Sequence, residues 1–203
     1  MTKPLRTLSL SALVLVLICS QALAQPAQSR RIRGTVESLD SNVLMVKARD
    51  GTDVKIKLAD NWTAISYTKA QLSDIKVGGF IAVGGTPQPD GSQRAVSINI
   101  FPESARGLGE GFRPWDGAPN GTMTNANVAE AVAGVEGQML LLKYKDGEKK
   151  IIVPPATPVA LFGPGEKAEV KPGVAVAVTA AMKPDGSLEA ARVGVGRDGL
   201  VPN

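Results

Sequence analysis

The chain repeats one pattern twice, and this duplication constrains its fold more than any other feature. Residues 39–51 match residues 135–147 at a spacing of 96. The turn sequence Pro-Asp-Gly-Ser at residues 89–92 recurs 95 residues later. A period this long is typical of tandem domains, because solenoid repeats run to roughly 20–50 residues. We therefore expect two related modules, at residues 31–102 and 123–199.

Within each copy, apolar residues alternate with polar ones, as half-buried strands require. Val54, Ile56 and Leu58 follow an Asp-Gly pair at residues 50–51, which predicts a hairpin turn because glycine readily adopts positive φ. Residues 69–74 fit a short helical turn between the third and fourth strands. This order predicts an all-β fold of two small five-stranded barrels that resemble the oligonucleotide/oligosaccharide-binding (OB) barrel. A two-sheet sandwich is the alternative, since periodicity alone does not separate the two.

Residues 103–122, between the modules, are rich in glycine and proline and show no strand or helix period. Three of the eight aromatic residues of the mature chain lie in or beside this segment, so we expect an ordered strap whose rings pack against one or both modules. The alternative is a ligand or partner surface. The candidate binding residues of that surface are Phe101, Arg106, Phe112, Arg113, Trp115 and Asp116.

Residues 1–24 have the three parts of a cleavable export signal. Lys3 and Arg6 give a charged start, an apolar run follows, and a small-residue exit ends at Ala24. The apolar run is about half of the roughly 20 residues that cross a bilayer, so we expect cleavage after Ala24 rather than a membrane anchor. The mature chain is therefore expected to be periplasmic or secreted, with no transmembrane segment.

Composition narrows the chemistry open to the mature chain. The sequence has no histidine, and its one cysteine, Cys19, leaves with the signal. These absences exclude Ser-His-Asp and Cys-His catalytic sites and cysteine-rich zinc sites, and the mature chain can form no disulfide. The mature chain carries 21 Lys and Arg residues against 19 Asp and Glu residues, a balance that argues against a nucleic-acid partner. We expect no cofactor and assign no metal site, although carboxylates leave a hard-metal site open.

Five stretches carry a resemblance to a known family, at residues 74–80, 86–91, 109–116, 122–125 and 144–150. They look like a family of exported bacterial proteins built on a domain of unknown function. The resemblance covers nearly the whole mature chain and implies tandem OB-like modules without an established activity. Some relatives carry a metal-transporter permease label, which does not fit a mature chain without a membrane span. Histidines commonly stand in relatives where this chain has Asn99 and Phe112, so a metal role that depends on those histidines does not carry over from the resemblance.

Three functions are compatible with these features. The first is an exported, non-enzymatic binding protein that takes an unknown ligand or an envelope component through the strap aromatics and an adjoining barrel face. The second is a structural or stress-protective protein whose partners are other envelope proteins. The third is a hydrolase with a carboxylate pair drawn from Glu103, Glu110 and Asp116. Neighbouring arginines would keep those acids ionised, which disfavours a general-acid role.

Overall fold

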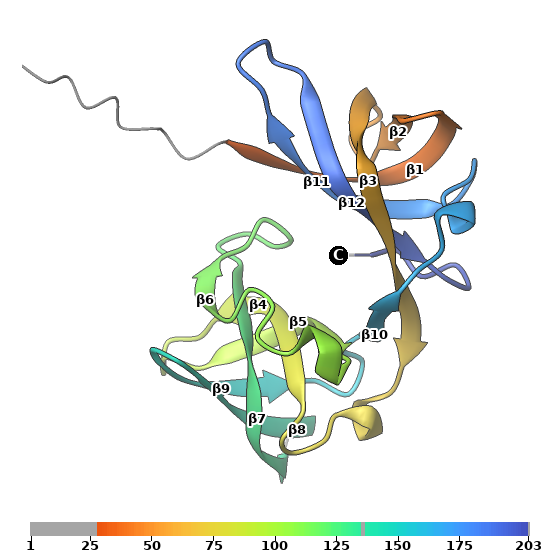
Figure 1. The fold of residues 1–203 in the computed structure, drawn as a ribbon. Coiled ribbons are helices and arrows are strands. Elements are labelled where there is room, and N and C mark those ends of the chain that lie inside the picture. The colour runs from red at the N-terminus through yellow and green to blue at the C-terminus, as the bar shows by residue number, and fades with distance from the viewer. Residues whose placement is uncertain (1–27, 135–136, 203) are drawn as a thin grey trace, which may run out of the picture.

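The protein is almost entirely β-strand. Its structure, a computed structural model, describes residues 28–134 and 137–202. This part of the chain contains three short 3-10 helices and no α-helix (Figure 1). The all-β prediction is confirmed. The predicted export signal at residues 1–24 lies outside the described residues.

Two runs of elements repeat the same order of three strands, a 3-10 helix and two strands. The first run comprises β1 (Ser29–Asp40), β2 (Val43–Ala48), β3 (Asp53–Ala70), η1 (Leu72–Asp74), β4 (Phe80–Pro87) and β5 (Gln93–Phe101). Between the runs lie η2 (Glu103–Ala105) and β6 (Gly111–Pro114). The second run comprises β7 (Thr122–Gly134), β8 (Gly137–Tyr144), β9 (Gly147–Val153), β10 (Val159–Pro164), η3 (Lys167–Glu169), β11 (Ala175–Met182) and β12 (Leu188–Gly196). Strands β9 and β10 of the second run together take the place of the single long strand β3, because β10 stands 95 positions after the last part of β3.

The hairpin turns form as the sequence predicts. Gly51, between β2 and β3, has a φ of +84°, a conformation in which a side chain would be strained. The two Pro-Asp-Gly-Ser turns are built alike, because in each the aspartate accepts a hydrogen bond from the serine two residues later. The Oγ–Oδ1 distance is 2.6 Å for Ser92 with Asp90 and also for Ser187 with Asp185.

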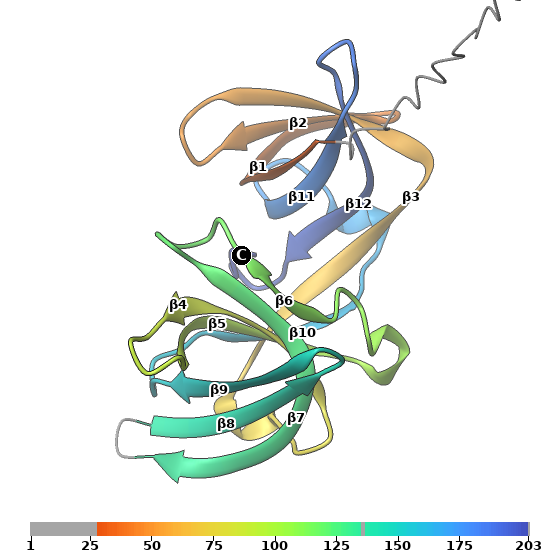
Figure 2. The same ribbon diagram turned by 90° about the vertical axis from the view of Figure 1, so that its left-hand side faces the viewer.

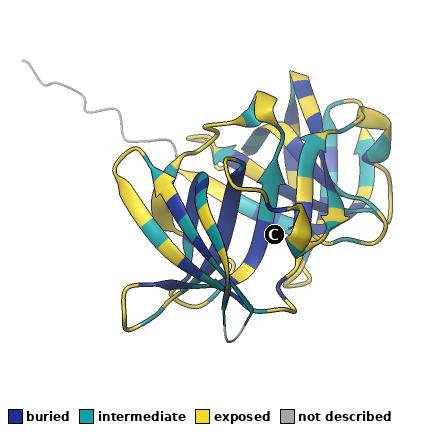
Figure 3. Cartoon of the chain, turned by 90° about the horizontal axis from the view of Figure 1, so that it is seen from below, coloured by how far each residue is buried: buried dark blue, intermediate teal, exposed yellow. Residues whose placement is uncertain are grey.

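The strands close into two five-stranded barrels, which Figures 1 and 2 show as separate bodies. Barrel 1 contains β1, β2, β3, β11 and β12, and parallel pairing of β12 with β3 closes it. Barrel 2 contains β4, β5, β7, β8 and β9, and a short parallel pairing of β5 with β9 closes it. Buried residues alternate with exposed ones along the strands, so each barrel has an apolar interior (Figure 3). The OB-like barrel is confirmed, and the sandwich alternative does not apply.

Each barrel takes strands from both sequence repeats, which differs from the expectation that residues 31–102 and 123–199 each close their own barrel. The first repeat contributes β1–β3 to barrel 1 and the β4–β5 hairpin to barrel 2, and the second repeat does the reverse. The cores follow the barrels. In barrel 1, Ile32 of β1 packs in one cluster with Val178 of β11, whereas Ile98 of β5 packs with strands of the second repeat in barrel 2.

The exchange has a visible cause in β3, which runs straight out of barrel 1 instead of turning back. Its first part pairs with β2, and its last six residues pair antiparallel with β10. Tyr67 and Phe162 oppose each other in this pairing, with ring centroids 5.7 Å apart. These two residues are separated by the repeat spacing of 95, so a pseudo-twofold axis passes between them. Because β3 continues past this axis, β4 begins at the second barrel.

Candidate functional site

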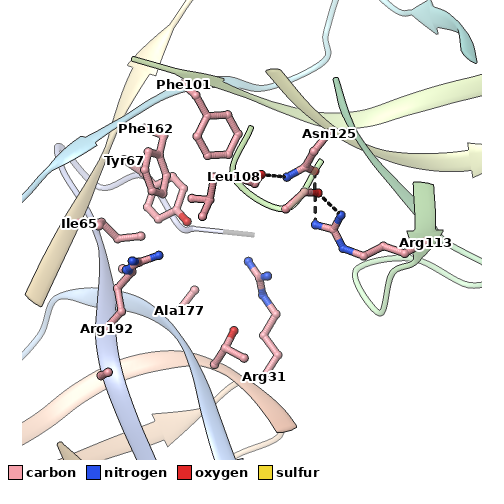
Figure 4. A pocket seen from close by; sticks show the side chains of 14 residues that line it. Arg31, Ile65, Tyr67, Phe101, Leu108, Arg113, Asn125, Phe162, Ala177 and Arg192 are labelled. Atoms are coloured by element: carbon pink, nitrogen blue, oxygen red, sulfur yellow. Dashed lines mark hydrogen bonds between the residues drawn. The ribbon is translucent and has the colours of Figure 1, made fainter. Parts of the chain in front are cut away.

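A cleft of about 400 Å³ lies between the two barrels (Figure 4). Strands β1, β11 and β12 of barrel 1 form one side, and the crossing strands β3 and β10 form its end. The other side comes from the end of β5, the segment that leads to β6, β6 itself and β7. Its volume lies in the range of small-molecule sites.

Three arginines, Arg31, Arg113 and Arg192, line the cleft. Among the described residues, no Asp or Glu side chain lines it with them. Burial lowers the pKa of the Arg31 guanidinium, with the nearby charge of Arg33 adding to the effect, and burial also lowers the pKa of Arg113. Both remain cations, because arginine does not deprotonate in proteins. The cleft therefore concentrates positive charge.

The arginines differ in how they are held. Arg113 donates from Nη1 to the carbonyl oxygen of Gly109 at 2.7 Å and from Nη2 to Oδ1 of Asn125 at 3.3 Å. Asn125 is fixed in turn, because its Nδ2 donates to the carbonyl oxygen of Leu108 at 2.8 Å. The guanidinium of Arg192, a residue that β12 pairs with Thr63 of β3, makes no hydrogen bond or ion pair within residues 28–134 and 137–202. Figure 4 shows the side chains of Arg31 and Arg192 directed toward the open space.

Aromatic rings form the opposite end of the cleft. The rings of Phe101 and Phe162 lie 4.6 Å apart, and Tyr67 meets Phe162 edge to face. Gly194 allows this packing, since a Cβ there would lie 2.8 Å from Cε2 of Tyr67. Burial raises the pKa of the Tyr67 phenol, so its hydroxyl stays protonated and able to donate a hydrogen bond. The cleft thus has a cationic end and an apolar, aromatic end.

A second hollow of about 510 Å³ adjoins the cleft and shares Arg31 and Arg113 with it. Trp115 and Asp116, which follow β6, lie in its wall. The Asp116 carboxylate accepts two hydrogen bonds from Arg33 of β1, at 2.6 and 3.1 Å. This bidentate ion pair ties the segment between the repeats to barrel 1.

Four of the six predicted binding residues gather around this site. Phe101 and Arg113 line the cleft, and Trp115 and Asp116 line the adjoining hollow. Trp115 is only 8% exposed and packs with Ala82 of barrel 2, as expected of a strap residue.

The other two predicted residues point elsewhere. Arg106 donates to the Glu103 carboxylate, to Oδ1 of Asn127 and to the carbonyl oxygen of Gly78. The exposed ring of Phe112 lies 4.6 Å from Nζ of Lys149.

Sequence reasoning missed Arg31, Arg192, Tyr67 and Phe162. Each lies in a strand, and nothing in the local pattern separates these residues from ordinary surface arginines or core aromatics.

The three acids of the hydrolase hypothesis are held apart by different partners. Glu103 binds Arg106, Asp116 binds Arg33, and Oε1 of Glu110 accepts a hydrogen bond from the backbone N–H of Lys145 at 3.0 Å. Hydrogen bonds from their arginines lower the pKa of Glu103 and of Asp116. Both acids are therefore poor proton donors, and they give no support to a carboxylate pair.

In the described part of the chain, no group of three or more His, Cys, Asp or Glu side chains gathers closely enough to hold a metal ion. None of the helices in residues 28–134 and 137–202 has the length and apolar character needed to cross a membrane.

The Arg33–Asp116 pair predicts an acid-sensitive contribution to stability. Arg33 holds the pKa of Asp116 below the value near 3.9 of an unfolded chain, so its stabilisation is present above about pH 4 and disappears as pH falls through the lower folded-state pKa. Asp116→Asn should lower the free energy of unfolding at pH 7 by less than about 1 kcal/mol, because the carboxylate is 56% exposed.

Urea denaturation of both proteins at several pH values between 7 and 2 measures this difference. Other acids titrate equally in the two proteins and cancel. If the difference in the free energy of unfolding between the two proteins widened toward pH 2, the assigned direction of the Asp116 pKa shift would be wrong.

Comparison with known proteins adds a family match to this geometry. The profile of a domain of unknown function (DUF5666) matches residues 33–99, which run from β1 into β5. This supports the predicted resemblance to a domain of unknown function, but it gives no support to the metal-transporter label. No curated protein and no solved structure matches the chain. The matched stretch is the first sequence repeat, whose last two strands complete the other barrel.

Proposed function

We propose that this chain is an exported, non-enzymatic binding protein that takes a small anionic ligand in the cleft between its barrels. The observation that carries the proposal is the cluster of Arg31, Arg113 and Arg192 in a cleft whose described lining contains no carboxylate. Guanidinium groups supply forked hydrogen bonds that suit carboxylate, phosphate and sulfonate oxygens.

The state of each arginine supports ligand binding over a purely structural role. The Arg113 guanidinium is oriented by neutral oxygens, those of Gly109 and Asn125, so its charge is not neutralised by these contacts. The Arg192 guanidinium lies in the cleft without a hydrogen bond or ion pair to another described residue. Cations partly removed from water gain most from an anion that replaces their hydration.

Export rests on the sequence of residues 1–24, with its charged start, apolar run and small-residue exit. An exported chain meets its ligand outside the cytoplasm, where a mature protein without cysteine forms no disulfide. Alkaline phosphatase fused after Ala24 tests this part of the proposal. Activity of the fusion outside the cytoplasm is the expected result.

Replacing cleft arginines should weaken anion binding strongly. The mature chain, residues 25–203, is titrated with phosphate, citrate and benzoate by calorimetry, and the tightest of these anions is taken forward. Arg192→Gln and Arg31→Gln should each weaken its binding about 10- to 100-fold, because a hydrogen bond to a charged group contributes roughly 1.5–3 kcal/mol. Added salt should weaken binding further.

Arg30→Gln is the matched control, since Arg30 neighbours Arg31 on β1 but does not line the cleft. It should bind the anion like the unmodified protein. If Arg31→Gln and Arg192→Gln bound the anion as tightly as Arg30→Gln, the cleft would not be the binding site. If no anion binds at all, the structural alternative becomes the better account.

A further inference from the structure

We infer that the ligand of the cleft is an aromatic anion, a molecule that joins a flat ring to a carboxylate, sulfonate or phosphate group. This inference rests on the proposed function and names the chemical class of its ligand. Three features favour an aromatic anion: the internal symmetry of the protein, the aromatic end of the cleft and the geometry of its arginines.

The pseudo-twofold symmetry relates the face of barrel 1 that lines the cleft to a face of barrel 2 on which an aromatic ring is already packed. We call this ring-covered face the internal template for a ligand. In barrel 2, Gly84 of β4 pairs with Met123 of β7, and in barrel 1 the corresponding pair is Thr179 of β11 with Arg31 of β1. Val83, beside Gly84, belongs to the core of barrel 2, and Ile32, beside Arg31, belongs to the core of barrel 1. Because side chains alternate across a strand, both pairs therefore lie on the outer face of their barrel.

The two equivalent faces are covered differently. On barrel 2 the indole of Trp115 lies on this face, packed with Ala82 and Met123, and a Cβ on Gly84 would lie 2.7 Å from the ring. On barrel 1 the equivalent face, with Ala177, Thr179 and Arg31, lines the cleft. The same fold position therefore packs a flat ring in one barrel and adjoins open space in the other.

The lining of the cleft is suited to a ring. Phe101 and Phe162 are half-buried and present aromatic surface beside Tyr67 (Figure 4). Aromatic rings favour edge-to-face and offset contacts with each other beyond the area that they bury. An aliphatic ligand of equal size would gain the burial but not this additional contact.

The equivalent positions of the two barrels also differ in charge, and the positive charge on barrel 1 suits an aromatic anion. Arg31 stands where Met123 stands in barrel 2. A planar guanidinium can stack on a ring and bind an oxyanion, so one side chain can contact both parts of such a ligand. Arg192 is placed to contact the charged group from β12.

Three matched probes test the inference by calorimetry on the mature chain. These are 2-naphthoate, its saturated analogue decahydro-2-naphthoate, and uncharged 2-naphthamide. We expect 2-naphthoate to bind at least tenfold more tightly than either of the others. Phe162→Leu should reduce the preference for the aromatic over the saturated carboxylate about three- to tenfold. Phe112→Leu, on an exposed ring outside the cleft, should leave the preference unchanged.

The outcomes separate this inference from the proposed function. Equal binding of the aromatic and saturated carboxylates would overturn the aromatic class while leaving an anion site. Equal binding of 2-naphthoate and 2-naphthamide would overturn the anion site itself. If Phe162→Leu lowers the melting temperature of the free protein, Phe101→Leu replaces it, and a preference unaffected by both variants would overturn the role of the aromatic end.

Discussion

Ile32→Ala should destabilise the protein by about 2–5 kcal/mol, and its energetic coupling should follow the barrel rather than the sequence repeat. Ile32 is 3% exposed and lies directly opposite Val178, which comes from the other repeat. Because the two side chains share one core, Ile32→Ala and Val178→Ala should show an interaction energy of about 0.5–3 kcal/mol in a double-mutant cycle. Urea denaturation followed by circular dichroism measures each free energy.

The matched control pairs Ile32→Ala with Ile98→Ala, two substitutions in the same repeat but in different cores. Their effects should add to within about 0.5 kcal/mol. The opposite pattern, with Ile32 coupled to Ile98 and additive with Val178, would mean that each repeat closes its own barrel.

Much of this fold is predictable from residue patterns. The alternation through Val54, Ile56 and Leu58 places one face inward, and all three are buried in the structure. The Asp-Gly and Pro-Asp-Gly-Ser turns lie where the hairpins turn, and η1 falls within the expected helical turn. These features depend on neighbours in sequence, so sequence alone can reveal them.

The exchange between repeats is not predictable in the same way, because the two repeats share one pattern of inward residues. A β4–β5 hairpin therefore suits β1–β3 and β7–β9 almost equally. What decides between them is the path of the connecting strand. The 18 residues of β3 greatly exceed the usual strand of about 5–6, and this length lets one strand pair with β2 in barrel 1 and with β10 beyond it.

The candidate site likewise contains residues that the sequence can reveal and residues that only the fold brings together. Phe101 and Arg113 could be proposed from sequence because large aromatic residues are unusual in or beside a glycine-rich connection, and its arginines supply the polar part of such a surface. Arg31 and Arg192 lie near opposite ends of the described chain and line one cleft only because β12 of the second repeat closes a barrel that begins with β1 of the first. The cationic half of the cleft is therefore a product of the exchange.

Trp115→Ala should cost about 3 kcal/mol, near the lower end for truncating a buried tryptophan, since the connection around it can partly collapse. The indole fits closely: Cβ atoms built on Gly84 and Gly117 would lie 2.7 and 2.0 Å from its ring. Phe112→Ala, in the same segment but 45% exposed, should cost less than about 1 kcal/mol. Denaturation followed by circular dichroism compares the two variants.

Free indole gives a sharper test of the same contact. An apolar cavity left by truncation can take up a ligand of the missing shape, and binding to the folded state stabilises it by mass action. Indole should therefore raise the melting temperature of Trp115→Ala but not that of Phe112→Ala. If indole had no effect and Trp115→Ala were as stable as the unmodified protein, the ring would not be what covers this face of barrel 2. The internal template for an aromatic ligand on barrel 1 would then be lost, while the arginines of the cleft would still favour an anion.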